Sequence, residues 1–183
     1  AYQTSGGLHG VGVTVVNFLS QWCEVEVSRD GWTWLQSYER GVPTTPLKQG
    51  RPTKKTGTKT TFKADAQIFQ QTKYSFDTVY KRLQELAFLN SGVHIKFLDE
   101  RNGEGGDFKY ERGIVEFVEH LNRASDPLHS DVILFTGARD GVVYDIALQY
   151  STEFTENVQS YVNNIHTIEG GTHVSGFRSA LTR

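Results

Sequence analysis

The sequence SGGLHGVG at residues 5–12 runs directly into VTVVNFL at residues 13–19, and the rest of the chain is organised around this junction. Four glycines in eight residues allow positive φ and let another molecule come close to the backbone. Apolar residues recur at helical spacing from Val11 to Leu19, so the pattern predicts a glycine loop that opens a helix. The unpaired amides at such a helix start favour a phosphate group.

The glycine spacing alone leaves two interpretations open. Gly7, Gly10 and Gly12 match neither the Rossmann nor the Walker pattern, and no lysine follows them. A flexible turn before an ordinary core helix therefore fits as well as a phosphate-binding loop.

Composition sets the outer limits. A chain of 183 residues can bury one core or two small ones, and a net charge of −2 gives no overall basic footprint for nucleic acid. Cys23 is the only cysteine, which excludes an internal disulfide and suggests a reducing, cytoplasmic compartment. No apolar run approaches the ~20 residues of a membrane span.

The pattern of residues 23–62 predicts a β-sheet. Residues 23–29 alternate as a strand, Asp30-Gly31 is a hairpin turn signal, and residues 32–39 should return as the second strand. Residues 41–56 are rich in Pro, Gly, Thr and Lys and indicate an exposed loop. A short strand is expected at residues 60–62.

Helices and strands mix after that. Ser75 can cap a helix whose core-facing stripe is Val79, Leu83, Leu86 and Leu89. A strand is expected at 93–98, a hairpin tip at 102–107, a helix at 114–121, strands at 132–135, 142–148 and 156–162, and a helix from about residue 172. The change in organisation predicts a domain boundary near residue 112.

The opening residues AYQTSGGLHGVGVTVVN resemble the ATP lid of the ATPase subunits of type IIA DNA topoisomerases, the gyrase B family. Further stretches follow in the family's order along nearly the whole chain. They are KTGT at 55–58, LQELAFLNSG at 83–92, NNI at 163–165, EGGTH at 169–173 and GFRSALTR at 176–183.

The resemblance implies an α+β fold in two parts. Residues 1–112 would be the C-terminal part of a GHKL-type (Bergerat) ATPase two-layer sandwich that lacks its N-terminal part. Residues 113–183 would begin the βαβ transducer domain. Because the chain has no methionine and starts inside the lid motif, we expect it to be an internal fragment of a longer protein.

The resemblance also implies a nucleotide site. Main-chain amides of the lid would wrap the β- and γ-phosphates, a tyrosine would lie beside the adenosine, and a threonine would bind the adenine. Arg29 matches an arginine at the pocket mouth. Surface and strand roles remain open for Tyr2, Thr58 and Arg29. The predicted nucleotide-binding residues are Tyr2, Gly7, Leu8, His9, Gly10, Val11, Gly12 and Thr58.

No catalytic residue and no metal ligand are predicted within the chain. In the family, the water-activating glutamate, the magnesium-binding asparagine and the adenine-reading aspartate precede the lid, and a phosphate-contacting lysine follows residue 183. Lys73, although it stands in a Gln-Thr-Lys tripeptide, is assigned to a solvated loop. His9 has no partner for proton transfer, and Cys23 lies on an alternating strand, so neither is expected to react.

The expected function is that of the ATP-binding, ATP-hydrolysing subunit of a gyrase, which supercoils DNA negatively by double-strand passage. ATP and Mg²⁺ would be its cofactors, and its partners would be DNA and the gyrase A protein in a heterotetramer. ATP-dependent dimerisation of the ATPase domains and no membrane association are expected. Alternatives are a topoisomerase IV subunit that decatenates DNA, another GHKL protein such as a chaperone or sensor kinase, or a non-enzymatic scaffold. The fragment alone is expected to be inactive.

Overall fold

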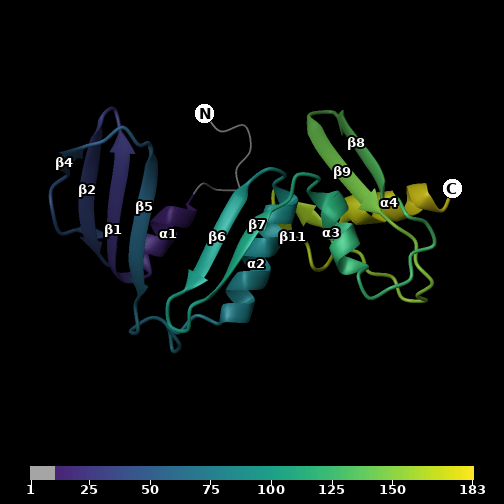
Figure 1. Cartoon of the computed structure of the whole chain (residues 1–183), viewed down its shortest axis with the longest axis horizontal. Helices are drawn as coiled ribbons and strands as arrows, with labels where there is room; N and C mark the ends of the chain where they lie inside the picture. The colour runs from purple at the N-terminus through teal and green to yellow at the C-terminus, as the bar shows by residue number, and fades with distance from the viewer. Residues whose placement is uncertain (1–10) are drawn as a thin grey trace. The chain divides into compact units, whose positions relative to one another are not determined.

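A computed structural model describes residues 11–183, and the chain forms two compact units (Figure 1). The first unit ends at Lys73, and the second runs from Tyr74 to Arg183. Both combine helices with antiparallel strands, so the fold is mixed α+β as expected.

The first unit is a five-stranded antiparallel sheet with one short helix packed against β1 and β2. Its strands run in the order β3-β2-β1-β5, and β4 also pairs with β2. The elements are α1 (Gly12–Phe18), β1 (Ser20–Arg29), β2 (Trp32–Glu39), β3 (Val42–Pro43), β4 (Lys48–Pro52) and β5 (Gly57–Ala64).

The predicted helix and hairpin at the start of this unit are confirmed. Helix α1 follows the glycine stretch, and β1 and β2 pair in register from Cys23 opposite Tyr38 to Arg29 opposite Trp32. Asp30 and Gly31 both adopt positive φ, 52° and 82°, which matches the twist that a two-residue hairpin needs.

The expectation of a plain loop at 41–56 is wrong, because β3 and β4 lie within it. Strand β4 pairs with β2 through Trp34 opposite Gln49 and Leu35 opposite Lys48. The β4 residues are Lys, Gln, Gly, Arg and Pro, so polar and apolar side chains do not alternate along the strand. An edge strand of this kind is stabilised by its neighbour and leaves no pattern of its own in the sequence.

Polar side chains occupy most of the fully buried positions in the first unit. Asp65 is 2% exposed and pairs with Arg40, with 2.6 Å between Oδ2 and Nε. The amide of Gln67 also donates to Asp65, and these two hydrogen bonds, the amide first, lower the pKa of the Asp65 carboxyl. The other fully buried residues here are Ser20, Cys23 and Thr33.

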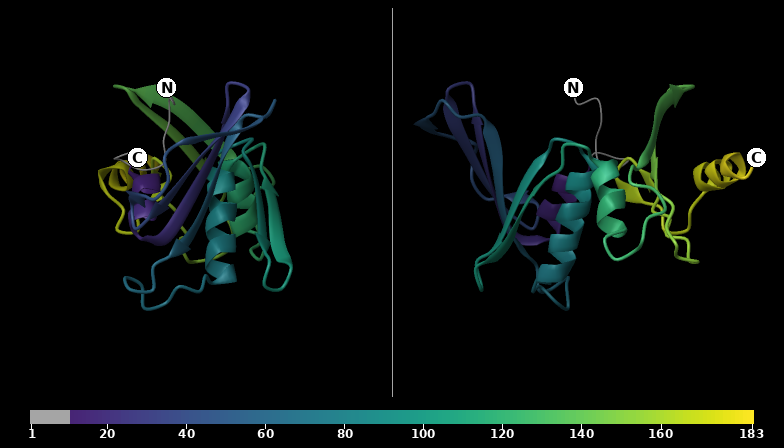
Figure 2. Two further views of the ribbon diagram at one scale, coloured as in Figure 1. Left: turned by 90° about the vertical axis from the view of Figure 1, so that its left-hand side faces the viewer. Right: turned by 45° about the vertical axis from the view of Figure 1, so that its right-hand side comes forward.

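The second unit contains three helices and three separate two-stranded hairpins, with α2 lying along β6 and β7 (Figure 2). The elements are α2 (Phe76–Leu89), β6 (His94–Asp99), β7 (Glu104–Lys109), α3 (Ile114–Leu121), β8 (Ile133–Arg139), β9 (Val142–Leu148), β10 (Tyr161–Val162), β11 (Ile165–His166) and α4 (Thr172–Leu181).

Aromatic rings build the core of this unit. Phe88 is 2% exposed and stacks on Tyr110 and Phe117, with ring centroids 3.7 Å and 4.9 Å away. Ser75 caps α2 as predicted, through its Oγ and the amide of Thr78. The fully buried residues of α2, however, are Ala87 and Phe88. They are buried because α3 packs against the C-terminal end of α2 and the β6–β7 hairpin packs along its side.

The expected hairpin is confirmed as β6–β7, but its turn occupies residues 100–103, so most of the glycine-rich stretch 102–107 is strand rather than hairpin tip. Strand β7 begins at Glu104 and includes two glycines. A Cβ on Gly105 would overlap the carbonyl of Phe97, and one on Gly106 would overlap the ring of Phe108. These glycines therefore permit close packing, a role that glycine content alone does not distinguish from a turn.

Two further expectations differ from the structure. The predicted strand at 156–162 is reduced to Tyr161–Val162. The division after Lys73 does not coincide with the predicted boundary near residue 112, since Phe88 of α2 packs on Phe117 of α3 across that position. The boundary stays a prediction about domain organisation.

Candidate functional site

The predicted nucleotide-binding residues fall into two groups. Val11, Gly12 and Thr58 belong to the part of the chain that the structure describes. The remaining five lie outside the described residues: Tyr2, Gly7, Leu8, His9 and Gly10.

Val11 and Gly12 stand at the start of α1. Val11 is the N-cap residue and makes no side-chain cap hydrogen bond, while its carbonyl accepts from the Val15 amide at 2.9 Å. A Cβ on Gly12 would meet no described atom within 4 Å. Packing among the described residues therefore does not require glycine at position 12.

Thr58 and Arg29 lie on the same face of the sheet. Thr58 of β5 is exposed and directly opposite Val27 of β1. Arg29 follows Val27 by two residues, so its side chain points to that same face. The Arg29 side chain is 76% exposed and lies 3.4 Å from Asp30. Trp34, opposite Val27 on the other side, extends the face.

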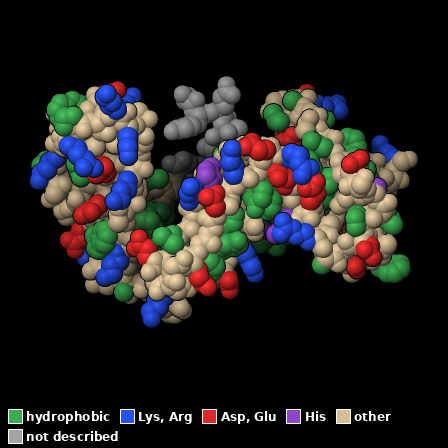
Figure 3. Space-filling model, viewed as in Figure 1, with side chains coloured by type: hydrophobic (Ala, Val, Ile, Leu, Met, Phe, Trp, Pro, Cys, Tyr) green, Lys and Arg blue, Asp and Glu red, His purple; other side chains and the backbone are tan. Residues whose placement is uncertain are grey.

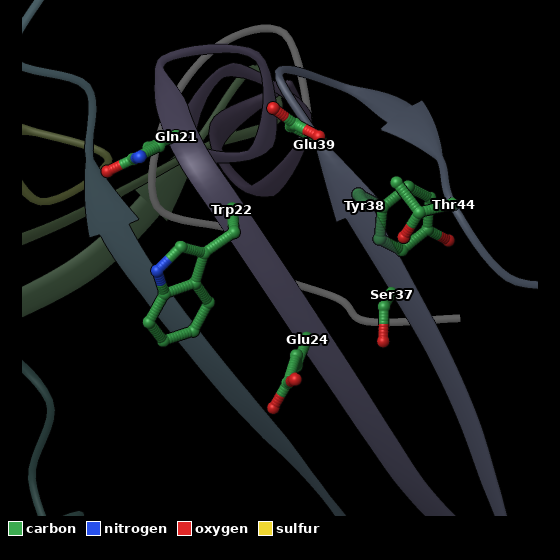
Figure 4. A pocket seen from close by; sticks show the side chains of 7 residues that line it. All are labelled: Gln21, Trp22, Glu24, Ser37, Tyr38, Glu39 and Thr44. Carbon is green, nitrogen blue, oxygen red and sulfur yellow. The ribbon is translucent and has the colours of Figure 1, made fainter.

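An open pocket of about 300 Å³ lies elsewhere in the first unit, over β1 and β2 (Figure 4). Trp22, Glu24, Tyr38 and Glu39 contribute to its walls, and no predicted nucleotide-binding residue does. Glu39 is already engaged by Arg40 at 3.2 Å. The pocket is lined by the Glu24 and Glu39 carboxylates and by the Ser37 and Thr44 hydroxyls, but by no His, Cys, Lys or Arg, so we assign no chemistry to it.

A smaller hollow of about 180 Å³ in the second unit lies between the ends of α2 and α3 and strand β8. Arg112 and Asp145 are its charged residues. Both terminal nitrogens of Arg112 bind the Glu119 carboxylate at 2.7 Å, which lowers the pKa of Glu119. The Arg112 guanidinium is thus engaged in an ion pair with Glu119 near the C-terminal end of α3.

No metal site is apparent in residues 11–183, where no group of three or more His, Cys, Asp or Glu side chains is placed to hold an ion. Cys23 is 1% exposed, and burial raises the pKa of its thiol, with Glu24 adding to the effect. A buried thiol that resists ionisation is a poor nucleophile, which agrees with the expectation from its strand position.

Sequence reasoning missed a polar contact between two of the family-like motifs. The side-chain amide of Asn164 donates to Oδ1 of Asn90 at 3.0 Å, and Arg82 donates to the main-chain oxygen of Asn164 at 2.9 Å. Both motifs stand out in the sequence, but nothing there shows that positions 74 residues apart touch each other.

Tyr161 lies near this contact, beside Glu85 and Arg82 of α2. Burial, followed by Glu85, raises the pKa of Tyr161 to about 12. Asn163 and Asn164 form the turn before β11 with φ of 50° and 65°. Asparagine adopts this left-handed backbone region more readily than most residues, so the turn conformation itself explains why two asparagines stand here.

No helix among residues 11–183 has the length and apolar character needed to cross a membrane.

Comparison with known proteins gives a consistent result. The sequence model described as DNA gyrase B matches residues 113–183. The DNA gyrase B subunit of Myxococcus xanthus is 49% identical over the whole chain, which covers 22% of that relative. The type 2 topoisomerase B subunit of Aquifex aeolicus is 50% identical and covered to 23%, and the DNA gyrase B subunit of Bacillus mycoides is 49% identical and covered to 46%.

Solved structures agree with the sequence matches. The 43K ATPase domain of Thermus thermophilus gyrase B, in complex with an aminocoumarin, superposes with a TM-score of 0.86 at 33% identity. The match covers 94% of this chain and 48% of that one. The B-subunit of the Myxococcus xanthus DNA gyrase gives a TM-score of 0.82 at 27% identity, covering 89% and 48%.

The chain therefore spans less than half the length of these curated relatives. Within that span the similarity is continuous from end to end, in sequence and in fold. Along its whole length the chain is similar to a part of DNA gyrase B subunits and of a type 2 topoisomerase B subunit.

Proposed function

We propose that the chain is part of the ATP-binding and ATP-hydrolysing subunit of a DNA gyrase, which introduces negative supercoils by ATP-driven double-strand passage. The observation that carries this is 49% identity along all 183 residues to a DNA gyrase B protein, together with the superposition on a gyrase B ATPase domain. DNA, a gyrase A protein and Mg²⁺ complete the proposed system.

In this proposal the glycine stretch holds the nucleotide's phosphates with main-chain amides. Among the described residues, no atom lies within 4 Å of a Cβ at Gly12, and the apolar Val11 provides no side-chain cap; both observations support the idea, because they leave the first amides of α1 to a ligand. Thr58 and Arg29 share the sheet face that would carry the base end of the site. The remaining residues of the set are Tyr2, Gly7, Leu8, His9 and Gly10.

The chain's own part in the reaction is positioning. Phosphoryl transfer depends mainly on orientation and on electrostatic stabilisation, which main-chain amides supply. The residues that activate water and bind Mg²⁺ would come from other parts of the protein. A GHKL-type sandwich followed by a transducer from residue 113 is the architecture we propose, and the family match that begins at residue 113 supports this division.

The test is nucleotide binding by the full-length protein carrying Gly12→Ala. We expect affinity for a nonhydrolysable ATP analogue to fall by about tenfold or more, a loss of about 1.4 kcal/mol. Gly176→Ala is the matched control, since Gly176 also lies in a helix with open space around it. Equal affinity in Gly12→Ala and wild type would remove the phosphate-binding role.

A plasmid assay with the gyrase A protein separates the neighbouring activities. Negative supercoiling of relaxed plasmid supports a gyrase, whereas decatenation without supercoiling supports topoisomerase IV. The second possibility is kept because the Aquifex aeolicus relative is described only as belonging to a type 2 topoisomerase.

A further inference from the structure

Charge is distributed very unevenly along the chain. Residues 1–73 carry nine Lys and Arg against five Asp and Glu, a net charge of +4. Residues 74–183 carry ten against sixteen, a net charge of −6. The overall value of −2 therefore hides a basic unit and an acidic one.

The positive charge of the first unit comes largely from one segment. Residues 40–64 contain seven Lys and Arg and no Asp or Glu. This segment includes β3, β4 and β5, and Figure 3 shows Lys and Arg side chains spread over the surface of that unit. The segment is basic because it lacks acidic residues altogether, whereas a typical solvated surface intersperses charges of both signs.

Several of these cations meet at one end of the sheet. The Thr53 amide donates to the carbonyl of Gly31 at 2.9 Å, which brings the β4–β5 loop to the β1–β2 turn. Arg51 is held on β2 by two hydrogen bonds with the Thr33 hydroxyl, of 3.0 Å and 3.2 Å. The basic end, as we define it, comprises Arg29, Arg51, Lys54 and Lys55 with the aromatic Trp32 among them.

The basic end is accessible and scarcely neutralised. All four of its cations are exposed, and Trp32, which lies between Arg29 and Pro52 in the register, is 38% exposed. The one acid at this end is Asp30, near Arg29. Arg51, Lys54 and Lys55 form no ion pair within 4.0 Å among the described residues.

We propose that the basic end binds the phosphate backbone of a duplex DNA segment. This rests on the proposed function, to which it adds a contact surface separate from the glycine loop; Arg29 belongs both to this surface and to the sheet face of the proposed nucleotide site. Exposed lysines and arginines without a pocket suit phosphate contacts, which position DNA without reading its sequence. A specific protein partner would require an apolar centre depleted of charge, and the basic end has the reverse composition.

The test is duplex DNA binding by the full-length protein, measured by fluorescence anisotropy over a range of salt concentrations. The variant is Arg51→Gln/Lys54→Gln/Lys55→Gln, which leaves Arg29 and the nucleotide loop intact. Each phosphate contact contributes about 0.9 to the slope of log K against log salt. We expect the slope to decrease in magnitude by about 2 to 3, with at least tenfold weaker binding at low salt.

The control Lys63→Gln/Lys73→Gln/Lys81→Gln removes the same charge from exposed positions that do not belong to the basic end. Its slope should remain that of the wild type. Equal losses of DNA affinity in both variants would mean that only net charge matters and would overturn the proposal that the basic end binds DNA. Polyglutamate is the competing ligand. If it binds the wild type as tightly as DNA does, and if the variant loses as much affinity for polyglutamate as for DNA, the partner would be an acidic protein and the proposal of DNA would be overturned.

ATP-analogue binding by the same preparations separates this inference from the proposed function. Nucleotide binding with an unchanged DNA slope in the variant refutes the basic end alone. If the variant loses DNA affinity while the wild-type protein binds no ATP analogue, the DNA-binding role of the basic end is supported and the proposed ATPase is refuted.

Discussion

The two units of the chain have opposite kinds of interior. In the first unit, Cys23 is the one fully buried apolar residue among those described, and it is accompanied by Ser20, Thr33 and Asp65. In the second unit, the buried apolar residues are Ala87, Phe88 and Phe108, and both phenylalanines belong to aromatic clusters. Asp99, paired with Arg101, is the one buried polar residue described there.

This contrast means that the two units depend on different interactions. The three fully buried polar residues described in the first unit each have a hydrogen-bond partner: Val16 for Ser20, Arg51 for Thr33, and Arg40 and Gln67 for Asp65. Such a unit is sensitive to strand register and backbone geometry. The second unit relies on apolar burial, which is sensitive to side-chain volume.

The chain contains built-in reporters for the two units. All three tryptophans, Trp22, Trp32 and Trp34, lie in the first unit, so tryptophan fluorescence follows that unit alone. The longer helices, α2, α3 and α4, lie in the second unit, so helical circular dichroism follows mainly that one.

The largest effect is expected from Phe88→Ala. Removing a ring stacked between Tyr110 and Phe117 should destabilise the second unit by about 3–5 kcal/mol, because the cavity is enclosed on both sides. The helical signal should melt at lower denaturant concentration while the tryptophan transition stays in place. A common shift of both transitions would show that the units unfold together and would weaken the contrast.

Gly41→Ala tests the geometry of the first unit. Gly41 has φ of 82°, and a Cβ there would overlap the Phe18 ring, so both strain and steric conflict oppose the substitution. We expect a loss of about 1–3 kcal/mol in the tryptophan-monitored transition, with the helical signal little changed. Gly141→Ala is the control, since its φ is also positive but its Cβ would meet nothing within 4 Å.

A smaller effect is expected where Asn164 meets Asn90. Asn164→Gly keeps the positive φ accessible and removes the side-chain hydrogen bond, and Asn90→Ala removes its acceptor. A double-mutant cycle on the helical transition should give a coupling energy of about 0.5–1.5 kcal/mol. Strictly additive losses would show that the 3.0 Å contact contributes nothing to stability.

The smallest effect is a difference in response to acid. Burial, followed by Arg123, lowers the pKa of His120, and its buried Nδ1 has no hydrogen-bond partner among the described residues. The folded state therefore favours neutral His120, and this part of its stability is lost as pH falls below the unfolded pKa of about 6.5. Residues 11–73 contain no histidine.

The helical transition should accordingly weaken between about pH 7 and pH 5 before the tryptophan transition does. His120→Phe should flatten that dependence, because the ring lies among apolar neighbours beside Phe88. The same pH dependence in His120→Phe and wild type would assign the effect to another group.

How far the sequence predicts this structure depends on how local each feature is. The β1–β2 hairpin follows from alternation interrupted by Asp30-Gly31, and α2 follows from the Ser75 cap and its apolar spacing. Of the nucleotide site, every candidate residue comes from the family resemblance. Periodicity alone leaves a plain glycine turn equally possible.

The features that sequence reasoning missed are all contacts between distant residues. Strand β4 exists because β2 lies beside it, Gly105 and Gly106 are needed because Phe97 and Phe108 are close, and Asn90 meets Asn164 only in the folded unit. The pairing of Arg51 with Thr33 likewise assembles the basic end from separate segments.

The turns, the capped helix, the alternating strands, the resemblance to gyrase B proteins and the separation of charge all follow from the amino-acid order. Each depends on neighbouring residues or on overall composition. Three-dimensional packing was needed to show which glycines relieve close contacts, which ring of α2 becomes the core, and which cations gather at one end of a sheet. These depend on chain segments meeting across long separations, and a residue carries no local mark of the partner it will meet.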